Sequence, residues 1–159
     1  MTITILCVGK IKERYLTDAV AEYTKRLSRY AKVEIVEVRD ERTKEDASER
    51  EREQILGAEG KRLLARIGER DYVAALAIDG EMPDSEGLAA FIGRRMNQGD
   101  SRICFVIGGS CGLSAEVMKR ADTALSFSKL TFPHQLMRVI LLEQIYRSFR
   151  ILNHEPYHK

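Results

Sequence analysis

The side chains that most often do polar chemistry gather in one short stretch, "SFSKLTFPHQLMRV", residues 126–139. It carries Lys129, Thr131, His134 and Arg138, which offer two cations, a hydroxyl and an imidazole. Cations near a reacting group favour its anionic form, and an imidazole can move a proton near neutral pH. The same residues also suit a helix start, with Phe132 as a hydrophobic staple and His134 solvated in the first turn. The local pattern leaves both interpretations open.

A second group of such side chains lies at the C-terminus. All three histidines, His134, His154 and His158, occur from the last predicted helix onward, and "NHEPYHK" adds Tyr157 beside His158. From residue 129 to residue 159 there are five Lys or Arg against two acidic residues. A basic end with an aromatic ring and imidazoles suits a phosphate backbone and unstacked bases. A frayed, solvated terminus fits the same composition.

Several common kinds of site find no support in the residue patterns. "GGSCG" at 108–112 lacks the spacing of the nucleotide-binding glycine motifs and the lysine of a triphosphate loop, although its glycines allow a sharp turn and close approach of a flat ligand. A plain turn between strand and helix is the other interpretation of this segment. No serine stands in a nucleophile elbow, and the histidines and cysteines lack metal-ligand spacing, so we expect neither a catalytic triad nor a metal. The odd number of cysteines, Cys7, Cys104 and Cys111, favours free thiols over disulfides.

Five apolar runs rich in β-branched residues predict strands, and helical periodicity appears between them. The strands are predicted at Ile3–Val8, Val33–Val38, Tyr72–Ile78, Ile103–Ile107 and, more weakly, Thr123–Phe127. Helices are predicted around residues 15–27, 49–67, 84–98, after Ser114 as N-cap, and from Pro133 to about Asn153. This alternation predicts an α/β fold with a mostly parallel sheet and helices on both faces.

Ligands of such sheets settle beyond the carboxyl ends of the strands. Three loops therefore matter: "LAIDGE", "VIGGSCGLS" and "SFSKLTFPH", from strands that can lie side by side. The last helix is apolar almost all the way round, because the four apolar residues Val139–Leu142 span about 300° of a helix at roughly 100° per residue. One sheet face cannot bury them all. We therefore predict a homodimer through this C-terminal helix.

Length and composition indicate an ordinary globular chain. Its 159 residues, 44% hydrophobic and 31% charged, are the size of one domain, and we expect a single domain over residues 1–159. No apolar run is long enough to span a bilayer, and residues 1–10 do not form a signal peptide, so we expect a cytoplasmic protein with no membrane association. The net charge of +2 is too small to indicate nucleic acid by itself.

Four segments carry a resemblance to a known family. "ITILCVGKIKERYLTDAVAEYTKRL", "VIGGSCGLS", "LSFSKLTFPHQLMRVILLEQIYRSF" and the terminal "EPYHK" resemble the ribosomal RNA large subunit methyltransferase H family of the SPOUT class. The resemblance runs in order along essentially the whole chain. It implies a C-terminal trefoil knot, and S-adenosyl-L-methionine-dependent methylation of N3 of a pseudouridine in the 23S rRNA of the assembled 70S ribosome, by a cytoplasmic homodimer.

The resemblance also assigns residues. It implies cofactor contacts at Leu76, Gly108, Phe127, Ser128, Lys129, Leu130, Thr131 and Phe132. Two positions depart from the family pattern: Cys111 stands where Asn or Glu is common, and Ala77 where an acidic residue is common in the third strand. Asp79 could replace that acid only if the strand continues, because residues two apart share a face of a strand.

Methyl transfer to an imide nitrogen requires the loss of its proton. Our hypothesis is that Arg138, Tyr157 and His158 orient or deprotonate the base, with the tail acting across the dimer interface and Lys129 near rRNA phosphate. Two alternatives remain: a ribosome-binding factor without turnover, and a SPOUT methyltransferase acting on tRNA. Specific cofactor binding would distinguish the methyltransferase from the binding factor, and the RNA that is methylated would distinguish it from the tRNA enzyme.

Overall fold

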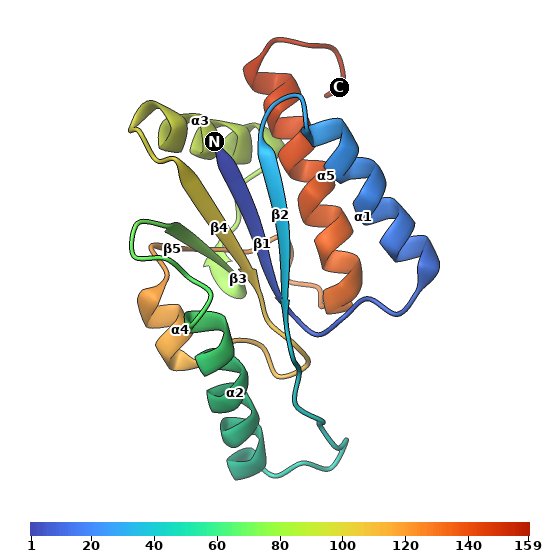
Figure 1. The fold of residues 1–159 in the computed structure, drawn as a ribbon, viewed down its shortest axis with the longest axis vertical. Helices are drawn as coiled ribbons and strands as arrows, with labels where there is room; N and C mark the ends of the chain where they lie inside the picture. The colour runs from blue at the N-terminus through green and yellow to red at the C-terminus, as the bar shows by residue number, and fades with distance from the viewer.

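The computed structural model describes residues 1–159 and contains one five-stranded parallel sheet with helices on both faces (Figure 1). The strands lie in the order β2-β1-β4-β3-β5 and all neighbours run parallel. Their bounds are β1 Thr2–Val8, β2 Lys32–Val38, β3 Tyr72–Glu81, β4 Arg102–Ile107 and β5 Thr123–Leu125. The helices are α1 Arg14–Leu27, α2 Glu49–Leu64, α3 Ser85–Asn97, α4 Ala115–Arg120 and α5 His134–Leu152. The predicted α/β class and parallel sheet are confirmed, whereas the trefoil knot stays a prediction.

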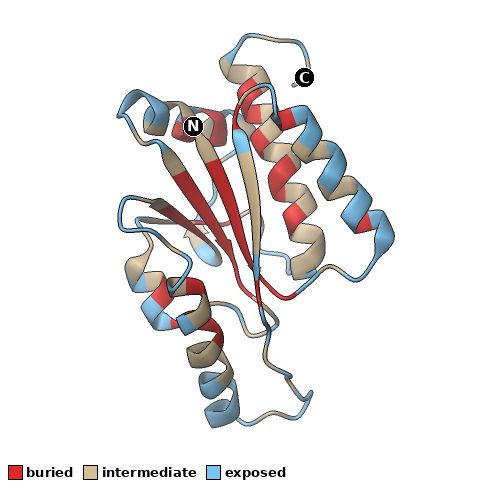
Figure 2. Ribbon diagram, viewed as in Figure 1, coloured by how far each residue is buried: buried red, intermediate tan, exposed pale blue.

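The two faces of the sheet bury two separate cores. Successive residues of a strand point to opposite faces, so Ile5 and Cys7 belong to one core while Leu6 and Val8 belong to the other. The larger core packs against α1, α3 and α5, and the smaller one against α2 and α4. Both faces are covered, which explains why the strands are continuous apolar runs (Figure 2). None of the helices is long and apolar enough to cross a membrane.

Side-chain caps set the starts of three helices. Ser48, Asp84 and Ser114 each accept a hydrogen bond from the backbone N–H three residues later, at 3.1, 2.7 and 3.3 Å. The predicted cap at Ser114 is confirmed. Pro133 precedes α5 in an extended conformation rather than occupying its first turn, so the helix begins one residue later than predicted.

The ends of β3 and β5 differ from the prediction. β3 continues to Glu81, with a register irregularity between Leu76 and Glu81, and β5 stops at Leu125 instead of continuing to Phe127. The cause is a close crossing, because the N–H of Ser126 donates to the carbonyl of Glu81 over 2.7 Å. A Cβ at Gly80 would lie 2.6 Å from the backbone of Ala124, so glycine permits this crossing. The chain after Leu125 is thereby released from the sheet into the loop that leads to α5.

Candidate functional site

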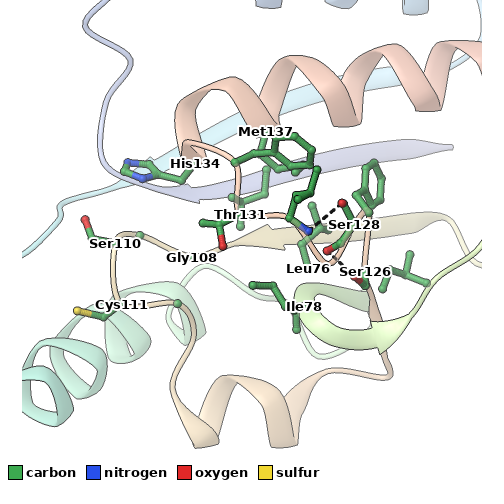
Figure 3. A pocket seen from close by; sticks show the side chains of 18 residues that line it. Leu76, Ile78, Gly108, Ser110, Cys111, Ser126, Ser128, Thr131, His134 and Met137 are labelled. Atoms are coloured by element: carbon green, nitrogen blue, oxygen red, sulfur yellow. Dashed lines mark hydrogen bonds between the residues drawn. The ribbon is translucent and has the colours of Figure 1, made fainter. Parts of the chain in front are cut away.

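The three segments singled out in the sequence meet at one edge of the sheet. "VIGGSCGLS" and "SFSKLTFPH" form the loops after β4 and β5, whereas "LAIDGE", predicted as a loop, is the last part of β3 itself. The three strands are neighbours in the order β4-β3-β5, so their carboxyl ends lie side by side. Between these loops and the start of α5 lies a cavity of about 390 Å³ (Figure 3). Its lining residues are Leu76, Ala77, Ile78, Ile107, Gly108, Gly109, Ser110, Cys111, Gly112, Leu125, Ser126, Phe127, Ser128, Leu130, Thr131, Phe132, His134 and Met137.

The glycine loop after β4 forms one wall of the cavity and depends on its glycines. The N–H of Gly112 donates to the carbonyl of Gly109 over 3.0 Å, which closes a tight turn, and Gly112 has a φ of +87°. A Cβ at Gly108 would lie 2.6 Å from the carbonyl carbon of Gly112. Side chains at these positions would prevent the loop from folding back. The wall is therefore made of exposed backbone, which suits a flat ligand held by backbone groups.

The loop after β5 forms the opposite wall and is folded by its own hydrogen bonds. Ser126 Oγ donates to the carbonyl of Ser128 over 3.1 Å, and the N–H of Leu130 donates to Ser128 Oγ over 2.9 Å (Figure 3). These bonds turn Phe127 and Leu130 toward the cavity that they line. Leu130 remains 70% exposed at its mouth. The resulting cavity is walled mainly by apolar groups and backbone.

Seven of the eight predicted cofactor-binding residues line this cavity. The exception is Lys129, which is exposed and is not among the lining residues. Ala77 is part of the wall, whereas Asp79 is exposed and is not, although β3 does continue past it. Asp79 therefore does not replace a missing acid at this cavity. The cofactor role of the lining residues stays a prediction.

His134 is a lining residue that the sequence pattern pointed to only weakly. The sequence left open whether it is a solvated first-turn residue or a group that does chemistry, and the structure makes it half-buried at the cavity, which Ser110 and Cys111 also line (Figure 3). Burial lowers the pKa of His134, and the Arg138 cation lowers it further, while Asp40 opposes the shift. The imidazole is therefore biased toward its neutral form. Its position directly after the strand-end loop was the signal for such a role.

Arg138 is buried inside the protein and does not line the cavity. Its guanidinium donates to Glu37 of β2 over 2.6 Å and to the carbonyls of Gly9 and Val8 over 2.7 and 3.1 Å. The side chain has no exposed surface, and its Nε has no partner. Arg138 thus ties α5 to the ends of β1 and β2.

Tyr157 and His158 lie at the opposite end of α5 from the cavity (Figure 1). α5 has 19 residues and so is roughly 28 Å long. Within one chain the structure therefore does not bring the tail to the cavity. The tail is nevertheless fixed rather than frayed, because Tyr157 donates to Glu143 over 3.1 Å and Arg150 donates to the carbonyl of Pro156 over 2.8 Å.

The three cysteines are free, and two of them are inert. Burial raises the pKa of Cys7 and of Cys104 to about 12, so both thiols stay protonated in the core. Cys111 is half-buried in the glycine loop, with its Sγ 3.9 Å from Thr43 Oγ1. No group of three His, Cys, Asp or Glu side chains is arranged to hold a metal ion.

Comparison with known proteins connects this geometry to a family. The family described as "Predicted SPOUT methyltransferase" matches residues 1–158. The protein named ribosomal RNA large subunit methyltransferase H from Bifidobacterium animalis subsp. lactis (strain AD011) is 58% identical over 159 residues, covering both chains fully. The protein of the same name from Clostridium kluyveri (strain ATCC 8527) is 55% identical, again over the full length of both.

Two solved structures have a similar fold at low sequence identity. A probable methyltransferase from Bordetella pertussis Tohama I has a TM-score of 0.56 at 12% identity, over 92% of this chain and 95% of that one. A probable methylase family protein from Haemophilus influenzae Rd KW20 has a TM-score of 0.54 at 12% identity, over 99% of this chain and 70% of that one. At this identity the similarity concerns the fold alone.

Proposed function

The chain belongs to the SPOUT methyltransferases, in the family of ribosomal RNA large subunit methyltransferase H, and we propose that it methylates large-subunit rRNA. In the full proposal, the methyl donor is S-adenosyl-L-methionine and the acceptor is N3 of a pseudouridine in 23S rRNA. The substrate is the assembled 70S ribosome in the cytoplasm. Full-length relatives at 55–58% identity support the reaction class.

The cavity at the ends of β4, β3 and β5 is the observation that carries this proposal. Its volume of about 390 Å³ is in the range of small-molecule sites, which is about 300–1,000 Å³. Its walls are glycine backbone and apolar side chains, with no lysine or arginine among the lining residues. A ligand with a flat adenine and a sulfonium but no phosphate fits such a site. A nucleoside triphosphate would need cationic partners that the lining lacks.

The two walls of the cavity would hold the cofactor from opposite sides. The turn between Gly108 and Gly112 presents bare backbone to the adenosine, and it exists only because a Cβ at Gly108, which would meet the Gly112 backbone, is absent. Leu76 and the loop from Phe127 to Phe132 enclose the other side. When bound, S-adenosyl-L-methionine supplies a methyl group on a positively charged sulfur. An in-line displacement breaks that S–C bond and forms the N3–C bond, so positioning supplies most of the catalysis.

The acceptor imide must release its proton to solvent or to a base before it attacks. The cavity contributes one half-buried imidazole, His134, but no carboxylate. We propose that the remaining polar groups come from Tyr157 and His158 of a second subunit, since a tail one helix length away cannot serve its own cavity. Lys129, which is exposed beside the cavity, is left free to meet rRNA phosphate.

The outer surface of α5 supports a homodimer. Leu136, Val139 and Ile140 are half-exposed and lie outside both core clusters, whereas the adjacent Leu141 and Leu142 are completely buried. The three outward residues are spaced three and four apart, so they form one stripe along the helix. A second copy of the same stripe is the simplest cover for it, because most soluble oligomers are symmetric homo-oligomers.

The test measures methyl incorporation from labelled S-adenosyl-L-methionine. Intact 70S ribosomes, separated subunits and tRNA are prepared from a strain lacking this protein. Label confined to the large-subunit rRNA of 70S particles is expected. Label on tRNA would show that tRNA, and not large-subunit rRNA, is the substrate. Cofactor binding without label on any of these RNAs would mean that the acceptor is another RNA. Absence of both binding and label would favour a ribosome-binding factor without turnover.

A further inference from the structure

The second half of α5 holds the residues Tyr157 and His158 of the tail through the ion pair Glu143–Arg147. The Arg147 guanidinium donates to Glu143 Oε1 from Nε over 3.1 Å and from Nη2 over 2.6 Å. The same carboxylate oxygen accepts the hydroxyl of Tyr157 over 3.1 Å. Both partners are mostly covered, with side chains 19% and 24% exposed, so this pair is shielded compared with an ordinary surface pair.

Arg147 also contacts the ring of His158, and this contact fixes the position of the ring proton. Its Nη1 lies 3.1 Å from His158 Nδ1. A guanidinium has only donors, so Nδ1 must present its lone pair, and the proton of the neutral ring must sit on Nε2. A proton on Nδ1 would remove this bond and set two N–H groups against each other. Arg147 therefore selects the Nε2–H form of His158.

The Nε2–H group is free to reach a substrate. The charged groups at the ring are Arg147 of α5 and Glu86 of α3; Glu143 is the ion-pair partner of Arg147, and Lys159 follows in the chain. Glu86 Oε1 is 4.0 Å from Nε2, beyond hydrogen-bond distance, and the Glu86 side chain is 75% exposed. A carbonyl oxygen of a nucleobase can displace so weak a contact.

Tyr157 serves as the anchor of this arrangement. Its ring meets Tyr146 edge to face with 5.0 Å between centroids, and the Arg147 guanidinium lies 4.8 Å from its centroid. Its hydroxyl proton is engaged by Glu143, and burial and that carboxylate raise the pKa of Tyr157 to about 12. A phenol in this state does not accept a proton from an imide at neutral pH. Tyr157 thus orients the tail and leaves His158 as its free polar group.

We propose that Glu143 and Arg147 are positioning residues that hold His158 as an Nε2–H hydrogen-bond donor, not a base, for a carbonyl oxygen of the methyl-accepting pyrimidine. This inference rests on the proposed function and specifies which of the two possible tasks, orienting or deprotonating, the tail performs. An imide that loses its N3 proton places negative charge on the two flanking carbonyl oxygens. A fixed donor aimed at one of them stabilises that anion, and the proton itself leaves to solvent.

The tautomer is measured directly by ¹⁵N NMR of the full-length protein, through the long-range couplings of the histidine rings at a pH where the rings are neutral. His158 is expected to carry its proton on Nε2. Arg147→Met, which has no donor, is expected to give a mixture of tautomers, and Arg147→Lys, which keeps a donor, to restore Nε2–H. Arg14→Met, at an exposed ion pair of α1, is the matched control and is expected to leave the spectrum of His158 unchanged. A wild-type ring protonated on Nδ1 overturns the proposal.

Turnover on ribosomes separates a donor from a base. His158→Ala is expected to lower kcat about 10²-fold, as for loss of one fixed donor to an oxyanion. His158→Gln, whose amide N–H₂ reaches the place of Nε2 but cannot take a proton, is expected to keep kcat within about tenfold of wild type. Equal loss in the two variants overturns the donor role. A wild-type protein that methylates no RNA overturns the proposed function instead, and the NMR result still decides the positioning by Arg147.

Discussion

The Arg138 guanidinium lies 2.6 Å from the Glu37 carboxylate, joining the first turns of α5 to the end of β2. The arginine side chain has no exposed surface, while the glutamate side chain is 34% exposed. The two partners thus differ in what is left behind when the other is removed. A buried cation cannot recruit water, but a partly exposed carboxylate can.

Glu37→Gln is therefore expected to destabilise the protein more than Arg138→Met. The first leaves a buried guanidinium without a counter-ion, at a cost of about 3 kcal/mol. The second leaves unpaired carbonyls at Val8 and Gly9 and a solvated carboxylate, for about 1–2 kcal/mol. Urea unfolding of both variants, beside the exposed Arg14→Met as control, measures the difference. The reverse order would mean that Glu37, and not Arg138, is the costly group to leave unpaired.

Gly108→Ala is expected to abolish cofactor binding without unfolding the chain. Its Cβ would lie 2.6 Å from the carbonyl carbon of Gly112, so the loop must open and the wall of the cavity is lost. An affinity loss of at least about 100-fold, near 3 kcal/mol, is expected by calorimetry with S-adenosyl-L-methionine.

Gly57→Ala is the matched control for this substitution. A Cβ at this position in α2 has no atom within 4 Å, so cofactor affinity should be unchanged and stability should rise by about 0.5–1 kcal/mol. Normal affinity in Gly108→Ala would show that the glycine loop is not part of the cofactor site.

The strands of the sheet and the edge where the cavity lies could be predicted from the sequence, because each depends on residues that are close together in the chain. Strands buried on both faces are continuous apolar runs, and Ser114 starts a helix through its own hydroxyl. The carboxyl-end rule then gathers the three loops without further information. The eight cofactor residues came from the family resemblance and not from this rule, and seven of them line the cavity at this edge.

The pairings that the sequence could not reveal are long-range. Arg138 and Glu37 are 101 residues apart, and no periodicity indicates that they meet. The separation of His158 from the cavity likewise depends on α5 being straight and continuous along its length. The end of β5 depends on its close crossing with β3 at Gly80. Glycine is needed there because a side chain would collide with the backbone of Ala124, and strand propensity does not reveal such a contact.

Glu59 is expected to make stability depend on pH in the direction opposite to most carboxylates. Burial raises its pKa, and the negative charges of Asp40 and Glu41 add to the shift. The hydrogen bond from the backbone N–H of Glu41 and the positive charge of Arg62 oppose it. Oε2 accepts the N–H of Glu41 over 2.9 Å, but Oε1 is buried beside the glycine loop without a partner. Because the folded state holds this proton more tightly, stability falls as pH rises from the ordinary glutamate range through the raised pKa.

Glu59→Gln should remove this fall. The variant is expected to be more stable than wild type at pH 8 by about 1 kcal/mol, the scale of one buried polar contact, with a smaller difference at pH 4.5. Unfolding in urea at the two pH values measures it. Glu53→Gln, exposed on the same helix, is the control and should shift neither value. A variant that loses stability at pH 8 would mean that the charged form is the one the fold favours.

Ile140→Glu is expected to convert the proposed dimer to a monomer. Ile140 belongs to the half-exposed stripe with Leu136 and Val139, so a symmetric interface through this stripe would bury two new carboxylates close together. Sedimentation at micromolar concentration should give the mass of a monomer. The variant monomer should remain folded, because Ile140 lies outside both cores. Thr17→Glu, at an exposed position of α1, is the control and should remain dimeric. A wild-type protein that sediments as a monomer would remove the proposed interface.

A composite site predicts that two inactive variants restore each other. Gly108→Ala has a disrupted cavity wall and an intact tail, whereas His158→Ala has an intact cavity and a defective tail. In a mixed dimer, the tail of the first chain meets the cavity of the second, so one complete site forms. Random mixing by co-expression makes half of the dimers mixed, each with one good site of two, which predicts about a quarter of wild-type activity per subunit. If each tail served its own cavity, no mixture would contain a complete site, and activity would stay at the level of the separate variants.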